Sequence, residues 1–292
     1  MQFKVSTAPK LEGVIDLPGD KSITQRAMLL NSIATGQATI MNHNTGSDAL
    51  SMFNCLKNLG ADIKKESNGT NHKQLIKICG NGPKGLHKPR MDLNAENSGT
   101  TMRLLAGLLS GQPFDSIIDG DLSLRTRPMK RIIEPLSKMG AKINGTNNNS
   151  LPPISIYGGN LKGIKYSPEV ASAQVKSCLL IAGLFAEGPT VLYNLKPSRD
   201  HTERMLKSMG ANISIKKTEI TIQSSILQAK DIFVPGDISA ASFWLVAGSC
   251  HKNANILIKN VGINPSRIAI IKVLQSMGGR IKLINSDNTA VE

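Results

Sequence analysis

Residues 18–26 have the composition of an anion-binding site: Pro-Gly-Asp-Lys-Ser-Ile-Thr-Gln-Arg. An extended apolar stretch ends at Leu17, and we expect a helix to begin just after the Pro-Gly turn. On that helix Ser22 and Arg26 are four residues apart and share a face. The first N–H groups of a helix and the positive end of its dipole attract anions. Together with Lys21, these side chains predict a site for a phosphate or a carboxylate, although the spacing of a P-loop is absent.

Two further arginines stand where helices are expected to begin. Arg127 precedes Pro128, and Arg199 lies in the run Ser-Arg-Asp-His. Acidic residues are favoured at helix starts, so an arginine there indicates a ligand-binding role. A guanidinium group can pair with two oxygens of one phosphate or carboxylate. Arg267 lies near the same place in a later segment, and we interpret it as a solvated arginine at a helix start.

Two sequence patterns recur four times along the chain. One is a helix end, a glycine and the start of a strand, as in Leu-Ser-Lys-Met-Gly-Ala-Lys-Ile; the glycine suits the left-handed position after a helix. The other is the start of an apolar helix, 38 to 41 residues before the matching glycine. The glycines are Gly60, Gly140, Gly210 and Gly278, and the helix starts lie at Ser22, Gly99, Ser172 and Ser239. A repeating unit of helices and strands predicts an α/β fold with helices packed on sheets.

The composition argues against several classes of protein. The 292 residues include 35 Lys and Arg against 21 Asp and Glu, a formal net charge of +14. The basic residues are dispersed and aromatic residues make up only 3%, which disfavours nucleic-acid binding. Four widely spaced cysteines form no C-x-x-C pair, so we expect reduced, mostly buried thiols and no metal site. Without a signal peptide or a membrane-spanning stretch, the protein is expected to be cytoplasmic.

Six motifs, in their order along the chain, resemble those of the EPSP synthase (3-phosphoshikimate 1-carboxyvinyltransferase) family. They are Pro-Gly-Asp-Lys-Ser-x-x-x-Arg, Asn-x-Gly-Thr-x-x-Arg, Leu-x-x-Arg-Pro-Met, Ala-Ser-Ala-Gln-Val-Lys-Ser, Ser-Arg-Asp-His-Thr-Glu and Pro-Gly-Asp-x-Ser. The resemblance covers the whole chain. It implies an α/β (α+β), enolpyruvyl transferase-like repeat fold of βαβαββ units. On this basis residues 18–236 form one complete domain of three units, and residues 1–17 and 237–292 form part of a second domain.

The resemblance also implies a transferase of the shikimate pathway, which leads to chorismate and the aromatic amino acids. In the implied reaction, the 5-hydroxyl of shikimate 3-phosphate adds to C2 of phosphoenolpyruvate, C3 takes up a proton, and phosphate leaves. Neither a metal nor an organic cofactor is implied. The implied partners are these two small anions, with no nucleic acid and no membrane, and the protein is expected to be a monomer.

Shikimate 3-phosphate is implied to bind residues from all three units of the first domain. Lys21 is the implied catalytic residue, because it bridges both substrates. The residues implied to bind shikimate 3-phosphate are Lys21, Ser22, Arg26, Ser172, Ala173, Gln174 and Arg199. Since Ala173 has no hydroxyl, only its backbone N–H can serve.

Phosphoenolpyruvate is implied to lie beside the second expected apolar helix. The residues implied to bind it are Lys21, Gly99, Arg127 and Gln174. Gly99 lets the substrate approach the backbone, and Arg127 clamps its charged end.

The chain departs from the family in having four units, whereas family members have six. The absent units carry the aspartate and glutamate of proton transfer, and a lysine and two arginines that close over phosphoenolpyruvate. We therefore expect an N-terminal portion of the enzyme, truncated or encoded by a split gene, that is weakly active or inactive unless a C-terminal chain complements it. An incomplete second domain should also expose apolar side chains of residues 240–246.

Two other functions remain as alternatives. A related enolpyruvyl transferase acts on UDP-N-acetylglucosamine, but it pairs its lysine with asparagine and usually carries a cysteine in the loop matching residues 120–127. Here Ser22 follows Lys21 and that loop has no cysteine. The net charge also permits a non-catalytic protein that binds anions or nucleic acid. We interpret His201 as a helix-start residue and Asp237 as a helix cap, with no catalytic role for either.

Overall fold

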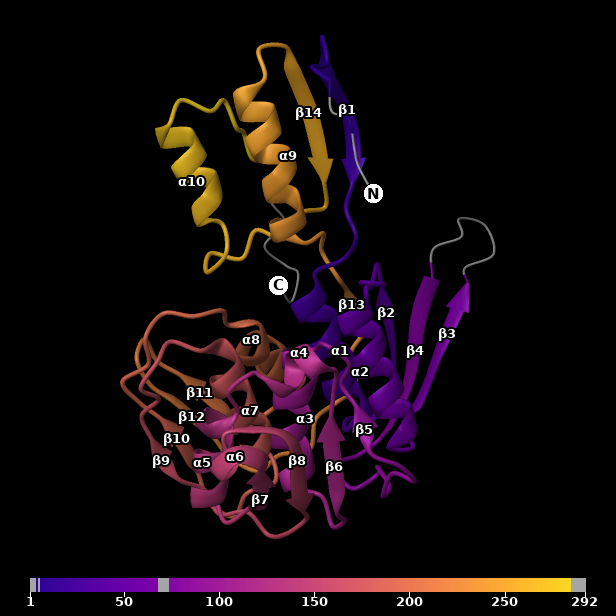
Figure 1. Ribbon diagram of the computed structural model, residues 1–292, viewed down its shortest axis with the longest axis vertical. Coiled ribbons are helices and arrows are strands. Elements are labelled where there is room, and N and C mark those ends of the chain that lie inside the picture. The colour runs from indigo at the N-terminus through magenta and orange to yellow at the C-terminus, as the bar shows by residue number, and fades with distance from the viewer. Residues whose placement is uncertain (1–3, 5, 68–73, 285–292) are drawn as a thin grey trace.

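The computed structural model describes residue 4, residues 6–67 and residues 74–284, which form a large body and a smaller lobe (Figure 1). In the body, the described residues build three four-stranded sheets. The smaller lobe contains a two-stranded sheet and two helices. A mixed α/β architecture confirms the fold class predicted from the repeats.

The three sheets of the body share one topology. Each begins with a parallel pair of strands, followed by two antiparallel pairings. In order across each sheet, the strands are β13 (Ile232–Phe233), β2 (Thr35–Met41), β4 (Gln74–Asn81) and β3 (Asp62–Ser67); β5 (Leu93–Asn94), β6 (Ser116–Asp119), β8 (Leu151–Tyr157) and β7 (Lys142–Gly145); β9 (Lys165–Tyr166), β10 (Thr190–Leu192), β12 (Ile220–Ile222) and β11 (Ile213–Ile215). β13 is the last of these strands in the sequence, yet it pairs with β2 and completes the first sheet. The end of the body therefore joins its beginning.

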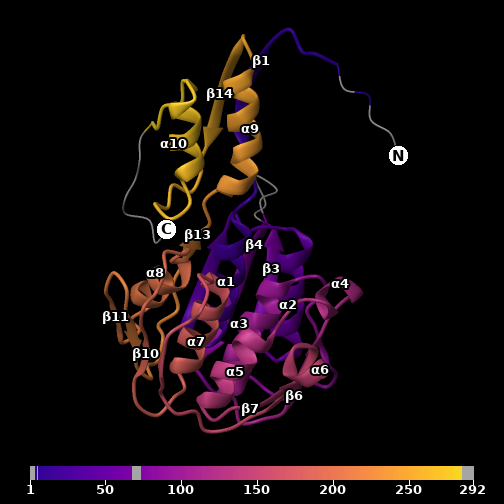
Figure 2. The same cartoon turned by 60° about the vertical axis from the view of Figure 1, so that its left-hand side comes forward.

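Each sheet carries one inner and one outer helix. The inner helices lie at the centre of the body (Figure 2): α1 (Lys21–Ser32), α3 (Gly99–Ser110) and α7 (Ala173–Gly183). All twelve residues of α3 are buried, polar ones included, because the helix is packed among α1, α7 and the strands β6 and β8. The outer helices are α2 (Ser47–Asn58), α5 (Lys130–Lys138) and α8 (His201–Ser208), and the single turns are α4 (Leu122–Arg125) and α6 (Thr146–Asn149).

The inner helices α3 and α7 approach one another closely because a glycine lies between them. A Cβ placed on Gly107 of α3 would lie 2.3 Å from the backbone oxygen of Cys178 on α7. No residue with a Cβ fits at this position, so the glycine sets the spacing of the two helices.

The predicted helix ends are confirmed. All four repeat glycines have a left-handed φ between 83° and 95°, a conformation that costs glycine little. They follow α2, α5, α8 and α10 (Ala269–Ser276).

The smaller lobe is built from both ends of the described chain. β1 (Leu11–Asp16) pairs in parallel with β14 (Ala254–Lys259), and α9 (Ile238–Cys250) and α10 complete the lobe (Figure 1). Its buried core is small and separate from that of the body; it comprises Leu17, Ile238, Ala241 and Ile271.

The expected apolar exposure of residues 240–246 is confirmed in this chain. On α9 Phe243 is 78% exposed, Trp244 40% and Val246 42%, whereas Ala241 is buried. Low solubility or self-association, which should follow from this exposure, stays a prediction.

The cysteines are all free, and two of the four are buried. Cys55 and Cys178 lie in the core, and burial raises the pKa of each thiol to about 12. Cys79 is partly buried and Cys250 is exposed, so the expectation of mostly buried thiols holds for half of them. Among the described residues, no helix combines the length and the apolar character that crossing a bilayer requires.

Candidate anion-binding site

The N-termini of the three inner helices are joined by side-chain hydrogen bonds. Asp20 caps α1, Ser98 caps α3 and Ser172 caps α7, each accepting a hydrogen bond from a backbone N–H of the first turn. Gln25 on α1 donates to Ser98 Oγ at 3.0 Å, and Gln174 on α7 donates to Thr100 on α3 at 2.8 Å. These bonds bring three positive dipole ends into one region.

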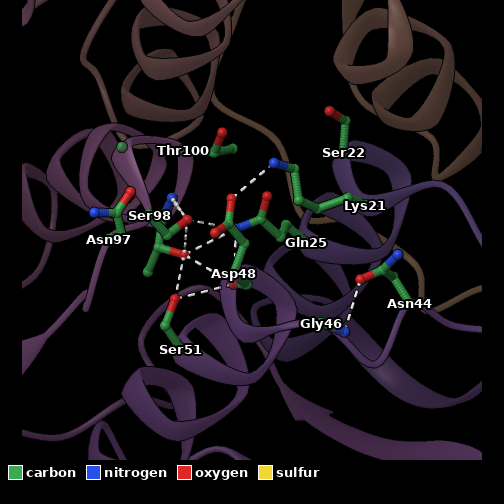
Figure 3. Close-up of polar contacts among 12 residues, drawn as sticks. Lys21, Ser22, Gln25, Asn44, Gly46, Asp48, Ser51, Asn97, Ser98 and Thr100 are labelled. Atoms are coloured by element: carbon green, nitrogen blue, oxygen red, sulfur yellow. Dashed lines mark hydrogen bonds and ion pairs between the residues drawn. The ribbon is translucent and has the colours of Figure 1, made fainter. Parts of the chain in front are cut away.

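Lys21, the first residue of α1, is paired with a carboxylate from α2. Its Nζ is 2.8 Å from Asp48 Oδ2, and its side chain is 45% exposed (Figure 3). Asp48 is not among the site residues predicted from the sequence. The ion pair orients the ammonium group while leaving it accessible to a ligand.

A buried polar network supports Lys21 and Asp48 from below (Figure 3). The amide nitrogen of Gln25 lies within hydrogen-bond distance of Ser98 Oγ, Thr101 Oγ1 and the backbone oxygen of Asp48, at 2.9 to 3.0 Å. Thr101 is also 3.0 Å from Ser51 Oγ. The network joins α1, α2 and α3. Nothing in the sequence marked Gln25, although a polar residue in a buried helix must find such partners.

Ser22 and Arg26 share a helix face as predicted. Arg26 Nη1 donates to the backbone oxygen of Ser22 at 3.0 Å, and the guanidinium also bonds Thr202 at 2.7 Å and Ser177 at 3.0 Å. Arg26 is only 3% exposed, so it lies beneath the helix start and ties α1 to α7 and α8. Arg26 therefore lies deeper than an arginine that binds a ligand at the protein surface would lie.

Arg199 meets Ser22 from the third unit. Its Nη1 donates to Ser22 Oγ at 3.3 Å, and its side chain is exposed. The two residues are 177 positions apart, yet both were predicted for the same anion. The structure therefore brings them together at the first turn of α1.

Gly99 lies under two arginines at the start of α3. A Cβ at this position would be 2.6 Å from Arg103 Nη1 and 3.4 Å from Arg127 Nη1. Arg127 is half-buried and donates to Asn97, whose amide in turn donates to Asp121 at 2.7 Å. The predicted pair of Gly99 and Arg127 is thus adjacent.

Arg103 is a site residue that sequence reasoning missed. It is 3% exposed and donates to Gln174 Oε1 at 2.6 Å and to the backbone oxygens of Gly99 and Pro128. Burial, together with the nearby Arg131 and Arg127, lowers its pKa to about 10. A signal existed in the sequence, since Arg103 follows Gly99 by four residues as Arg26 follows Ser22.

The start of α7 matches its prediction. Ser172 caps the helix through a 3.4 Å bond from the N–H of Val175, and Ala173 is its first residue. Gln174 joins α7 to α3 by accepting from Arg103 and donating to Thr100. All three predicted residues are partly exposed, so they lie at the surface of the same region.

Arg267 differs from its prediction. We expected a solvated arginine, but its side chain is only 10% exposed and contacts two carboxylates, Asp20 and Asp237. The interpretation was wrong because the loop before α10 folds against the body instead of facing water. His201 begins α8 and Asp237 caps α9, as expected.

The region as a whole has an excess of positive charge. Its carboxylates described above are Asp20, which caps α1, Asp48, which pairs with Lys21, and Asp121, which accepts from Asn97. The basic side chains are Lys21, Arg26, Arg103, Arg127 and Arg199. Such an arrangement suits small molecules that carry several negative charges.

Comparisons with known proteins agree with the motifs. Residues 5–292 match the family model described as EPSP synthase (3-phosphoshikimate 1-carboxyvinyltransferase). The chain is 46% identical over 283 residues to the 3-phosphoshikimate 1-carboxyvinyltransferase of Bacillus subtilis (strain 168), covering 97% of this chain and 65% of that protein. The corresponding protein of Petrotoga mobilis is 46% identical over 288 residues, with 98% and 66% covered.

A solved structure gives the same match. The EPSP synthase from Acinetobacter baumannii superimposes with a TM-score of 0.89 at 40% identity, covering 97% of this chain and 63% of that one. The chain therefore spans less than two thirds of the length of these relatives.

Proposed function

The chain belongs to the EPSP synthase family, and from this premise we propose that it binds shikimate 3-phosphate and phosphoenolpyruvate for enolpyruvyl transfer. The observation that carries the proposal is the meeting of three helix N-termini and five basic side chains at the family's motifs. In the reaction, the 5-hydroxyl of shikimate 3-phosphate loses its proton as its oxygen bonds to C2 of phosphoenolpyruvate, and C3 gains a proton. C3 then loses a proton as phosphate leaves C2, which restores the double bond.

We assign the phosphate of shikimate 3-phosphate to the region between α1 and α7. Ser22 and Arg199 are within 3.3 Å of each other and can bind one phosphate together. Ser172 and the N–H of Ala173 approach from the start of α7, and N–H groups at such a position favour an anion. Arg26, which is buried beneath Ser22, adds positive charge from below and holds the helices in place.

We assign phosphoenolpyruvate to the start of α3. Arg127 and the backbone at Gly99 are adjacent there, and Gln174 reaches the same helix through Thr100. Lys21 lies between the two proposed substrates, where its ammonium group can stabilise negative charge that develops during transfer. Asp48 keeps that group in position.

The proposed function brings further assignments with it. We propose that residues 18–236 form one domain, and that residues 1–17 and 237–292 belong to a second. The two hydrophobic cores and the separate sheets support this division. We also propose a cytoplasmic monomer that acts on small soluble anions and needs neither a metal nor an organic cofactor.

Calorimetric titration of the purified chain with shikimate 3-phosphate tests the proposal. Wild-type protein should give a saturable signal, and Lys21→Ala should weaken binding by at least about ten-fold, since a charge-assisted contact is lost. Lys217→Ala is the matched control, because that lysine is exposed and the charge change is the same. The absence of binding by folded wild type, or equal affinity for Lys21→Ala and wild type, contradicts the proposal.

A further inference from the structure

Arg267 joins the body to the smaller lobe through four polar contacts. Its Nη1 is 3.1 Å from Asp20 Oδ2 and 3.5 Å from His201 Nε2. Its Nη2 donates to Ser239 Oγ at 2.7 Å and is 3.5 Å from Asp237 Oδ1. A guanidinium presents donors on two sides, so a single side chain can contact both parts of the molecule at once.

On the side of the body, the contact is with the cap of α1. Oδ1 of Asp20 accepts the N–H of Ile23 at 3.0 Å, while Oδ2 faces Arg267. The carboxylate therefore has one oxygen on the helix and the other on the arginine, which restricts its rotation. Lys21 and Ser22 follow directly in the chain, so the first turn of α1 depends on this carboxylate.

On the side of the lobe, the contact is with the cap of α9. Oδ1 of Asp237 accepts the N–H of Ser239 at 2.8 Å and also faces Arg267. The two caps lie on chain segments that pair through an antiparallel bridge: the N–H of Asp20 donates to the backbone oxygen of Pro235, and the N–H of Asp237 donates to that of Pro18, at 2.8 and 3.0 Å. Arg267 thus links the two helix caps beside this bridge.

The loop that carries Arg267 makes a second connection to the body. Asn264 Nδ2 donates to Asp200 Oδ1 at 2.7 Å, and Asp200 is the cap of α8. Asn264 Oδ1 accepts from the N–H and the hydroxyl of Ser266, which holds the loop in shape. Arg267 is therefore held in place from both directions.

Arg127 and Arg199 stand at the corresponding places in the second and third units, yet their surroundings differ. Arg199 is exposed and Arg127 is half-buried, whereas Arg267 is 10% exposed between two carboxylates. We infer that Arg267 is a positioning residue that couples the smaller lobe to the first turn of α1, and so sets the placement of Lys21 and Ser22. Only the consequence for ligand binding rests on the proposed function.

Amide hydrogen exchange in Arg267→Ala tests the coupling without any ligand. Exchange should become about ten-fold faster at Ile23 and at Ser239, because each cap carboxylate loses a hydrogen bond to a charged group. The amide of Thr101, capped by Ser98 on α3, should be unchanged. Arg280→Ala is the matched control, since Arg280 is an exposed arginine of the same lobe.

Three outcomes overturn the inference: no acceleration at Ile23, acceleration at Ile23 without acceleration at Ser239, or equal acceleration at Ile23 and Thr101. The last of these indicates general destabilisation. If Arg267→Ala does not fold, Arg267→Lys makes the same comparison, with a smaller acceleration expected at the same amides because lysine can keep one carboxylate contact.

Titration with shikimate 3-phosphate tests the consequence for the site. Arg267→Ala should bind about ten-fold more weakly than wild type, as expected when a hydrogen bond to a charged group no longer positions Lys21 and Ser22. Arg280→Ala should bind like wild type. Equal binding by Arg267→Ala overturns the positioning role. If wild type itself does not bind, the proposed function fails, and the exchange measurement still decides the coupling.

Discussion

Helix α9 and the three inner helices of the body begin from the same repeated pattern, yet their surroundings are opposite. α1, α3 and α7 are buried almost throughout, because each is packed among the other helices and the three sheets. In α9 only Ile238 and Ala241 are buried, and Phe243 is 78% exposed. An apolar helix is therefore covered only when enough neighbouring elements surround it; its own sequence does not ensure burial.

The loops before the outer helices show a second difference between the two parts. In the body, Arg127 and Arg199 lie beside the helix starts of the candidate anion-binding region. In the smaller lobe, Arg267 is instead paired with Asp20 and Asp237. Arginines at one repeat position can thus stay partly accessible at the candidate site or be paired within the fold, and neighbouring carboxylates decide which.

Thiol reactivity should give the largest contrast between α7 and α9. Because the pKa of Cys178 is raised to about 12, only about one molecule in ten thousand carries the reactive thiolate there at pH 8. Cys250, at the exposed end of α9, should react with a thiol reagent at least about a thousand-fold faster. Mass spectrometry of briefly labelled protein locates the modified residue. Labelling of Cys178 at a rate close to that of Cys250 would show that the body opens readily.

Glycine substitutions should give the next largest effect. Gly107→Ala forces a Cβ to within 2.3 Å of a backbone oxygen on α7, so it should destabilise the protein by about 3 kcal/mol. Gly248→Ala on α9 meets only the end of the Ile256 side chain at 3.3 Å, so its free energy of unfolding should change by less than about 1 kcal/mol. Urea denaturation followed by circular dichroism measures both. Similar losses for the two variants would contradict the difference in packing.

Removal of an exposed ring from α9 should have the smallest effect on stability. Phe243→Ser should change the free energy of unfolding by less than about 0.5 kcal/mol, since the side chain is already in water. By contrast, Leu105→Ala in the buried helix α3 should lower the free energy of unfolding by about 2–5 kcal/mol. Sedimentation velocity should also show less self-association for Phe243→Ser than for wild type. If self-association is unchanged, the exposed face of α9 is not what drives it.

Most local features of this fold could be predicted from nearby residues. The caps at Ser172 and Asp237 follow from their side-chain oxygens, and the turn at Gly140 follows from the freedom of glycine at positive φ. The repeat then predicted the α/β class. Conformational preferences of this kind act over a few residues, so a short stretch of sequence contains all the information they need.

The partners of the polar residues could not be predicted in this way. Gln25 bonds Ser98 across 73 positions, Arg26 bonds Ser177 across 151, and Arg267 bonds Asp20 across 247. Arg103 and Asp48 were not predicted as site residues for the same reason, since their partners Gln174 and Lys21 lie far along the chain. Sequence alone determines where each helix begins, where it ends and which charges it carries. Tertiary structure alone decides which charges face a ligand and which are neutralised, because electrostatic pairing depends on distance in space and on burial.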